Sequence, residues 1–353
     1  MTAPAIPPSA ASVVDATVLI CTYNRAAWLG DTLDSIAALD LPSSMTWDVL
    51  VVDNNSIDDT RAVVEHRMAA YPVPLRYLFE GRQGKSNALN TGMAATAARV
   101  IVFTDDDVRV PRGWLTAAVT PLLERQDIDY TGGPVRPIWG GPRPAWLDEK
   151  GNLGGTIAVK DHGNAPFVFE DGRKTPLGVN MAVRRTLVER IGGFRPDLGR
   201  RGKSLLGQEQ AEFFYRSRRA GGRGLYVPEM VVDHHVPASR LTKSYFRRWW
   251  YWKGVSHARL HRLHDRTELG LSLSGVPRLF GVPRFVFGTM AASLRDWMRA
   301  LLERNPVKRA ERATMIAYTL GYIRESRRAP GPAGHEESLP LEAAGPSSRQ
   351  TAT

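Results

Sequence analysis

Three adjacent carboxylates, Asp105-Asp106-Asp107, directly follow the apolar run 99–104 of the 353-residue chain. Such a triplet repels itself unless a cation or hydrogen bonds offset the charge. Oxygen ligands of this kind suit Mg²⁺ or Mn²⁺, which one or two carboxylates and phosphate oxygens usually hold. Asp53 ends a second apolar run, 48–53, in a position to accept hydrogen bonds from a ribose or a base. The pattern predicts a divalent cation beside a nucleotide, the alternative being a solvated acidic turn.

A glycine-rich turn at 81–84 opens a helix and superficially resembles a phosphate loop. Glu80 follows Phe79 where the Walker spacing requires an earlier glycine, so the pattern excludes an ATPase P-loop. Lys85 remains a candidate for a diphosphate or a base edge, because the first turn of a helix favours an anion.

The elements that must position these groups alternate along the first 104 residues. Four short apolar strands are separated by segments with helical spacing, which indicates a mostly parallel α/β sheet with helices on both faces. Open sheets of this kind bind ligands at the carboxyl ends of their strands. The polar strand ends here are Thr22–Arg25, Asp53 and Asp105–Asp107. The strands are expected at 16–21, 48–53, 75–79 and 99–104, and the helices at 26–38, 60–70 and 86–97.

Charge divides the chain into two regions. Residues 1–239 hold 27 basic and 27 acidic side chains, whereas 240–330 hold 19 basic and 6 acidic ones, and the whole chain carries +11. We therefore expect four parts with different jobs. They are a disordered lead at 1–13, an α/β domain at 14–239, a basic aromatic helical region at 240–330 and a disordered tail at 331–353.

Composition excludes several classes of protein. The single cysteine, Cys21, rules out a disulfide framework and a cysteine-based zinc cluster. The start lacks the pattern of a signal peptide, and no apolar stretch is long enough to span a membrane. The expected location is cytoplasmic, with possible attachment to the inner face of the plasma membrane.

The ordered set of motifs resembles family 2 glycosyltransferases, which are inverting enzymes with the GT-A fold. The resemblance covers about residues 14–260. It rests on the segments 17–25, 49–54, 84–92, 103–108, 178–184, 191–197, 207–221 and 226–236. It implies a nucleoside diphosphate sugar donor, most often UDP-linked, a divalent cation, Mn²⁺ or Mg²⁺, and direct displacement at the anomeric carbon by an acceptor hydroxyl.

The resemblance also implies roles for individual residues. Asp53 would contact the nucleoside, Asp105 the ribose or the metal-bound region, and Asp107 the metal. His235 is preferred over His234 as a further metal or diphosphate ligand, because adjacent strand residues face opposite ways. The nucleotide pocket would be lined by Thr22, Tyr23, Asn24, Arg25, Lys85 and Asp106.

The catalytic base departs from the family pattern. Family members usually carry Glu-Asp near the start of this helix, and here Gln210 occupies the Asp position, where it cannot act as a base. Glu209 is the first candidate and Glu212 the second, on one helix face at i, i+3. The alternatives are a salt bridge with Arg216 for Glu212 and a dipole-favoured helix start for Glu209.

The sequence thus predicts an enzyme that moves a sugar to a hydroxyl of a glycan or a lipid-linked acceptor. Two alternatives remain: a sugar nucleotidyltransferase, which Thr22–Arg25 disfavours, and a non-catalytic nucleotide-sugar-binding assembly protein, which Gln210 motivates. The run 243–253 mixes Trp and Tyr with Arg and Lys, and 279–287 adds apolar surface. Such segments suit an anionic membrane surface rather than nucleic acid, or else pack on the catalytic body.

Overall fold

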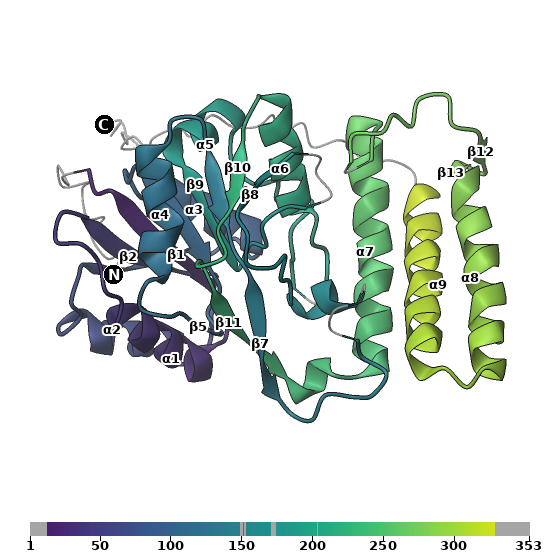
Figure 1. Ribbon diagram of the computed structural model, residues 1–353, viewed down its shortest axis with the longest axis horizontal. Helices are drawn as coiled ribbons and strands as arrows, with labels where there is room; N and C mark the ends of the chain where they lie inside the picture. Colours follow the sequence, from purple (N-terminus) through teal and green to yellow (C-terminus); the bar gives the residue numbers. More distant parts are fainter. Residues whose placement is uncertain are drawn as a thin grey trace, which may run out of the picture.

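The computed structural model describes residues 13–328 except 149, 150, 152, 171–173, 203 and 268, so the expected lead and tail lie almost wholly outside the described residues. An eight-stranded mixed sheet forms the centre, and its first four strands in chain order are parallel (Figure 1). In spatial order the strands are β3 (Leu75–Phe79), β2 (Trp47–Asp53), β1 (Ala16–Thr22), β4 (Val100–Thr104), β9 (Asn180–Arg184), β6 (Tyr130–Gly132), β10 (Gly224–Tyr226) and β8 (Phe167–Phe169). This confirms the expected α/β class.

Helices cover both faces of the sheet because alternate strand residues point to opposite sides. Val18 and Ile20 of β1 belong to one buried cluster, and Leu19 belongs to the other. The first cluster lies under α1 (Ala26–Ala37), α2 (Thr60–Met68) and α4 (Trp114–Glu124). The second lies under α3 (Lys85–Ala94), α5 (Arg185–Ile191) and α6 (Glu209–Arg219). Helix α4 is not among the helices expected from the sequence.

A second, three-stranded sheet brings distant parts of the chain to the carboxyl end of β4. Its strands in spatial order are β5 (Val108–Arg109), β11 (Val232–Pro237) and β7 (Val135–Gly140). His234 of β11 pairs with Val108 of β5, and Val108 directly follows the aspartate triplet. The sheet therefore fixes β11 beside the triplet.

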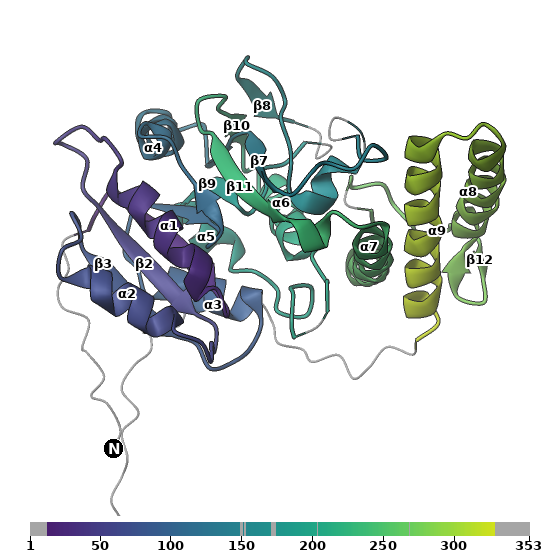
Figure 2. The same cartoon turned by 90° about the horizontal axis from the view of Figure 1, so that it is seen from below.

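Three long helices extend from one side of this body, with α7 (Lys243–His264) nearest, α9 (Pro306–Ser326) next and α8 (Arg284–Leu302) outermost (Figures 1 and 2). A short hairpin of β12 (Arg278–Leu279) and β13 (Val282–Pro283) precedes α8. Helices α7 and α9 touch backbone to backbone: a Cβ on Gly254 would overlap the carbonyl oxygen of Tyr318, and one on Gly321 that of Tyr251.

Helix α7 packs on the body through side chains of its aromatic run. Phe246 and Trp250 share a buried cluster with Leu147, Ile157 and Val236. The Trp250 indole N–H donates to the Thr156 hydroxyl oxygen, 3.0 Å away, in the 3₁₀ turn Gly154–Ile157. Among the described residues, no helix combines the length and apolar character needed to cross a bilayer.

Candidate active site

A cavity of about 420 Å³ lies at the carboxyl ends of β1 and β4, where the strand order switches direction. The switch arises because β2 and β3 extend the sheet on one side of β1 and β4 lies on the other. Eight of the predicted site residues line the cavity: Thr22, Tyr23, Arg25, Lys85, Asp105, Asp106, Asp107 and Glu209. Two of the three polar strand ends expected from the sequence, Thr22–Arg25 and Asp105–Asp107, thus contribute side chains to this cavity.

Lys85 reaches the cavity because hydrogen bonds with the Asn54 side chain fix the turn before α3. The side-chain Oδ1 atom of Asn54 accepts from the Gly84 amide at 2.7 Å, and Gly84 has φ 141°, where a side chain would be strained. Lys85 Nζ then donates to Asp105 Oδ1 at 2.6 Å. Burial opposes the charge on Asp105, but the Lys85 ammonium outweighs it and keeps the pKa of Asp105 below its ordinary value.

Asp107 sits among cationic and imidazole groups. Its carboxylate lies 3.5 Å from Arg25 Nη1, 4.0 Å from Arg240 Nη2 and 3.5 Å from His234 Nε2. Burial, together with the Asp107 charge, raises the pKa of Asp106 to about 7. Burial also lowers the pKa of His234, in spite of the attraction of Asp107, so its imidazole is neutral at pH 7.

The structure places His234, and not the expected His235, at this site. His234 is 2% exposed and lines the cavity, whereas the ring of His235 packs on Trp28 with centroids 4.6 Å apart. The backbone amide of His235 donates to the Asp107 carbonyl oxygen at 2.9 Å, which sets the register. Alternation along β11 was anticipated correctly, but which face holds the site depends on the pairing with β5.

The residues around Asp107 fit a divalent cation that a diphosphate helps to bind. No group of three or more His, Cys, Asp or Glu side chains in the described part of the chain is arranged to hold a metal alone. Asp107 and a neutral His234, 3.5 Å apart, would provide one oxygen and one nitrogen ligand on one wall. Mg²⁺ and Mn²⁺ take such partial sets when phosphate oxygens and waters complete the coordination.

Glu209, the first residue of α6, contributes a carboxylate with one unpaired oxygen to the cavity. Its side chain is buried, and its Oε2 atom has no hydrogen-bond partner in the described structure. Burial raises the pKa of Glu209 above its ordinary value, although Lys85 and Arg200 partly oppose this. A carboxylate with a raised pKa and a free oxygen is suited to accept a proton.

Gln210, which replaces the usual aspartate, has its side chain engaged by the neighbouring loop. Its Oε1 atom accepts from the Gly178 amide at 2.8 Å, and its amide group donates to the Pro176 carbonyl oxygen. Gln210 therefore fixes the 176–178 segment, which also lines the cavity at Gly178.

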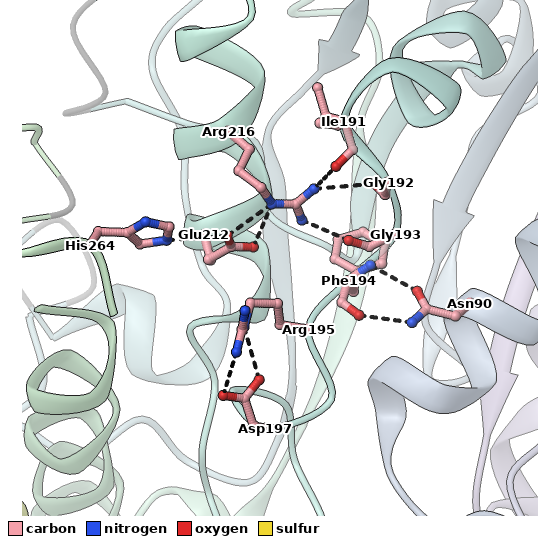
Figure 3. Close-up of polar contacts among 10 residues, drawn as sticks. All are labelled: Asn90, Ile191, Gly192, Gly193, Phe194, Arg195, Asp197, Glu212, Arg216 and His264. Atoms are coloured by element: carbon pink, nitrogen blue, oxygen red, sulfur yellow. Dashed lines mark hydrogen bonds and ion pairs between the residues drawn. The ribbon is translucent and has the colours of Figure 1, made fainter. Parts of the chain in front are cut away.

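Glu212 does not line the cavity and forms a structural network instead (Figure 3). Arg216 Nε donates to both of its carboxylate oxygens, at 2.8 and 2.9 Å, and His264 Nε2 lies 3.2 Å from Oε1. Arg216 also donates to the backbone carbonyls of Ile191, Gly192 and Gly193. The salt-bridge alternative for Glu212 therefore describes its place in the structure.

Two other predicted residues stay outside the cavity. Asp53 is buried and accepts from the Ser56 amide at 2.9 Å and from the Tyr77 hydroxyl at 2.7 Å. Asn24, with φ 51°, accepts from the Ile57 amide at 2.8 Å. Both anchor the 54–57 turn that follows β2.

Several lining residues were not assigned to the site from the sequence. Arg200 comes from the loop before α6, Arg240 follows β11, and Trp249 and Lys253 come from α7. Arg240 had a detectable signal, since it lies five residues beyond the His pair. The others depend on the path of the chain after the sheet, which no local pattern specifies.

The α/β body carries an acidic cavity at its switch point, and comparison with known proteins identifies the family to which such a body belongs here. Residues 17–192 match the model of Glycosyl transferase family 2. The chain is a family 2 glycosyltransferase, as the motifs indicated. It is 29% identical over 292 residues to the succinoglycan biosynthesis protein ExoM of Rhizobium meliloti (strain 1021), covering 80% of this chain and 88% of that one.

Two further matches agree with the family and the fold. Glycosyltransferase AglE of Haloferax volcanii is 26% identical over 65% of this chain and 70% of its own length. The mannosyltransferase PcManGT of Pyrobaculum calidifontis, solved with GDP-Man and Mn²⁺, superimposes with a TM-score of 0.60 at 20% identity. That superposition covers 91% of this chain and 89% of the mannosyltransferase, and it shows that the two share the GT-A fold.

Proposed function

We propose that this glycosyltransferase moves a sugar from a nucleoside diphosphate donor, UDP in the first instance, to a hydroxyl of a glycan or lipid-linked acceptor. The observation that carries the proposal is the unpaired, buried Oε2 atom of Glu209 in the same cavity as Lys85 and the aspartate triplet. Lys85 can bind the diphosphate of a nucleotide, and the aspartates can bind its accompanying cation. The free oxygen of Glu209 can accept the proton of an acceptor hydroxyl.

In this proposal Glu209 takes the proton from the acceptor hydroxyl as its oxygen attacks the anomeric carbon. Attack from the face opposite the leaving group inverts the configuration. Lys85, Arg25 and Arg240 lie where they can bind the diphosphate, and Asp107 with His234 would hold the divalent cation. When bound, that cation offsets the negative charge that develops on the leaving diphosphate.

The relatives support the acceptor class. One is named for succinoglycan biosynthesis, and another, 22% identical, is a glucosyl-dolichyl phosphate glucuronosyltransferase from Haloferax volcanii. A polysaccharide or lipid-linked glycan acceptor for this chain is inferred from those names.

A thermal-shift screen against nucleotide sugars, with and without Mn²⁺, followed by product analysis tests the proposal. We expect one nucleotide sugar to raise Tm, more strongly with Mn²⁺, and to support transfer with inverted stereochemistry. Binding without transfer or donor hydrolysis would instead favour the non-catalytic binding protein that Gln210 motivates.

A further inference from the structure

A second cavity, of about 230 Å³, lies between α7, α8, α9 and Trp146, apart from the candidate active site. Its apolar wall includes Trp146, Trp297 and Leu301. Its cationic side chains come from two helices: Lys243 and Arg247 from the first turns of α7, and Arg309 from the first turn of α9. The cavity thus combines an apolar wall with converging positive charge.

The three cations have no partners of their own. Among the described residues, Lys243, Arg247 and Arg309 have no partner for a side-chain hydrogen bond or an ion pair. Two acids that are close in sequence to the lining residues of α8 already have other partners. Asp296 lies 3.1 Å from Arg295 and 3.7 Å from Arg312, and Glu303 lies 2.8 Å from Arg299 and 3.6 Å from Lys308. Three cationic side chains without acidic partners around one cavity indicate a site for an anionic ligand.

The surface beside this cavity is apolar. Eleven of the sixteen exposed large apolar side chains among the described residues lie between Leu263 and Leu320. On α8, Leu294, Met298 and Leu302 lie on one face at i, i+4 and i+8, and Leu302 is 85% exposed. Leu301 links the two features, since it lines the cavity and is 46% exposed. Helix α8 is also the element farthest from the body (Figure 2).

We propose that this cavity, at the end of the helical bundle that holds the α8–α9 turn, binds an anionic phospholipid of a membrane surface. The phosphate would lie against Lys243, Arg247 and Arg309, and the acyl chain would lie along Leu301 and the apolar face of α8. Cations and apolar side chains in this arrangement are typical of proteins held at the headgroup level. The site uses Lys243, Phe246 and Arg247 of the run 243–253, whereas Trp250 of that run is buried against the α/β body.

The inference does not rest on the proposed donor chemistry, and its test needs no sugar transfer. The full chain is mixed with vesicles of phosphatidylcholine alone, or of phosphatidylcholine with phosphatidylglycerol, and binding is measured by flotation. We expect binding only to the anionic vesicles. Equal binding to both, or to neither, would overturn the proposal.

The proposed contact with the lipid phosphate is tested by a double variant, Arg247→Ala with Arg309→Ala. We expect binding to fall by about 30-fold, since each basic residue near an anionic surface contributes about 1 kcal/mol, or about fivefold in affinity. The matched control is Arg112→Ala with Arg136→Ala, which removes the same charge from exposed arginines of the α/β body. An equal loss in the control pair would mean that overall charge alone drives binding, and would refute the site.

The proposed contact with the acyl chain is tested by a double variant, Leu301→Ser with Leu302→Ser. The control is Leu271→Ser, in the segment between α7 and β12. Leu271 is 64% exposed, so all three changes are at the surface and unfolding is checked by thermal melts. We expect about tenfold weaker binding for the α8 pair only. Excess inorganic phosphate should not release the wild-type chain from vesicles; full release would make the site one for free phosphate and not for lipid.

Occupancy is tested with phosphatidylglycerol that carries bromine atoms on its acyl chains, which quench nearby tryptophans. Trp297 is one of nine tryptophans, so Trp297→Phe should remove part of the quenching. Quenching that is unchanged in this variant would place the lipid elsewhere.

Discussion

Replacing Glu209 by Gln tests the base directly, because Gln keeps the shape of the side chain and loses only the ability to take a proton. General-base catalysis contributes roughly 10²–10⁴-fold in rate. We therefore expect sugar transfer to fall by that factor, or about 3–5 kcal/mol in barrier height. The Kd for UDP with Mn²⁺, measured by calorimetry, should not change, since the cations and Asp107 are untouched.

The same variant should change stability with a defined sign. Burial raises the pKa of Glu209 in the folded state, so the protonated side chain stabilises the fold at pH values below the unfolded-state pKa. This stabilisation is lost as pH rises through the folded-state pKa. Glu209→Gln should thus be more stable than wild type at neutral pH, and the difference should shrink in acid. Urea unfolding at neutral and acidic pH measures this.

Glu212→Gln is the matched control on the same helix, and its signature is the opposite. Burial alone would raise the pKa of Glu212, but hydrogen bonds from His264 and Arg216 keep it below the ordinary value. Its stabilisation is therefore present at neutral pH and is lost as pH falls through the folded pKa. We expect a loss of about 3–5 kcal/mol at pH 7, because Arg216, whose side chain is only 20% exposed, loses its carboxylate partner. Transfer by the remaining folded enzyme should be unchanged.

Wild-type turnover in Glu209→Gln would refute the assignment of the base. A loss of transfer in Glu212→Gln that exceeds its loss of folded protein would move the role to Glu212. A Glu209→Gln variant less stable than wild type at neutral pH would contradict the reasoning from burial.

Three further changes give sharp outcomes. His234→Ala should raise the Mn²⁺ concentration for half-maximal transfer by about 10–100-fold, and His235→Ala should leave it unchanged. Gly254→Ala should lower stability by about 1–3 kcal/mol in thermal melts because α7 and α9 must separate, whereas Gly288→Ala, with open space around it, should not. Gln210→Asp should slow transfer instead of improving it, since it removes the amide that donates to the 176–178 segment; faster turnover would contradict this.

Local patterns predicted the first half of the sheet well. The strand at 75–79 begins and ends where it was expected, and β1, β2 and β4 differ by a residue at one end. Strands β1, β2 and β4 are buried on both faces, so their apolar runs are unambiguous. Helix α4 was missed, although its buried face includes Trp114 and Leu122.

The site was predictable where chemistry follows a strand directly. Asp105 to Asp107 lie at a strand end, so the sheet alone places them. The choice between His234 and His235 depends on which strand pairs with β11, a long-range contact that spacing cannot reveal. Trp249 and Lys253 reach the cavity only because α7 packs back on the body.

The contact between Gly254 and Gly321 determines where this chain can be shortened. Since the two helix backbones touch there, removing α9 would leave a groove along α7 with no side chain on α7 to fill it. Ala310 and Tyr318 of α9 would also be taken from the cluster around Phe246 and Trp250, which supports one wall of the active site. A chain that keeps α7 but ends before α9 should therefore lose stability, so a shortened enzyme should retain the residues through Ser326.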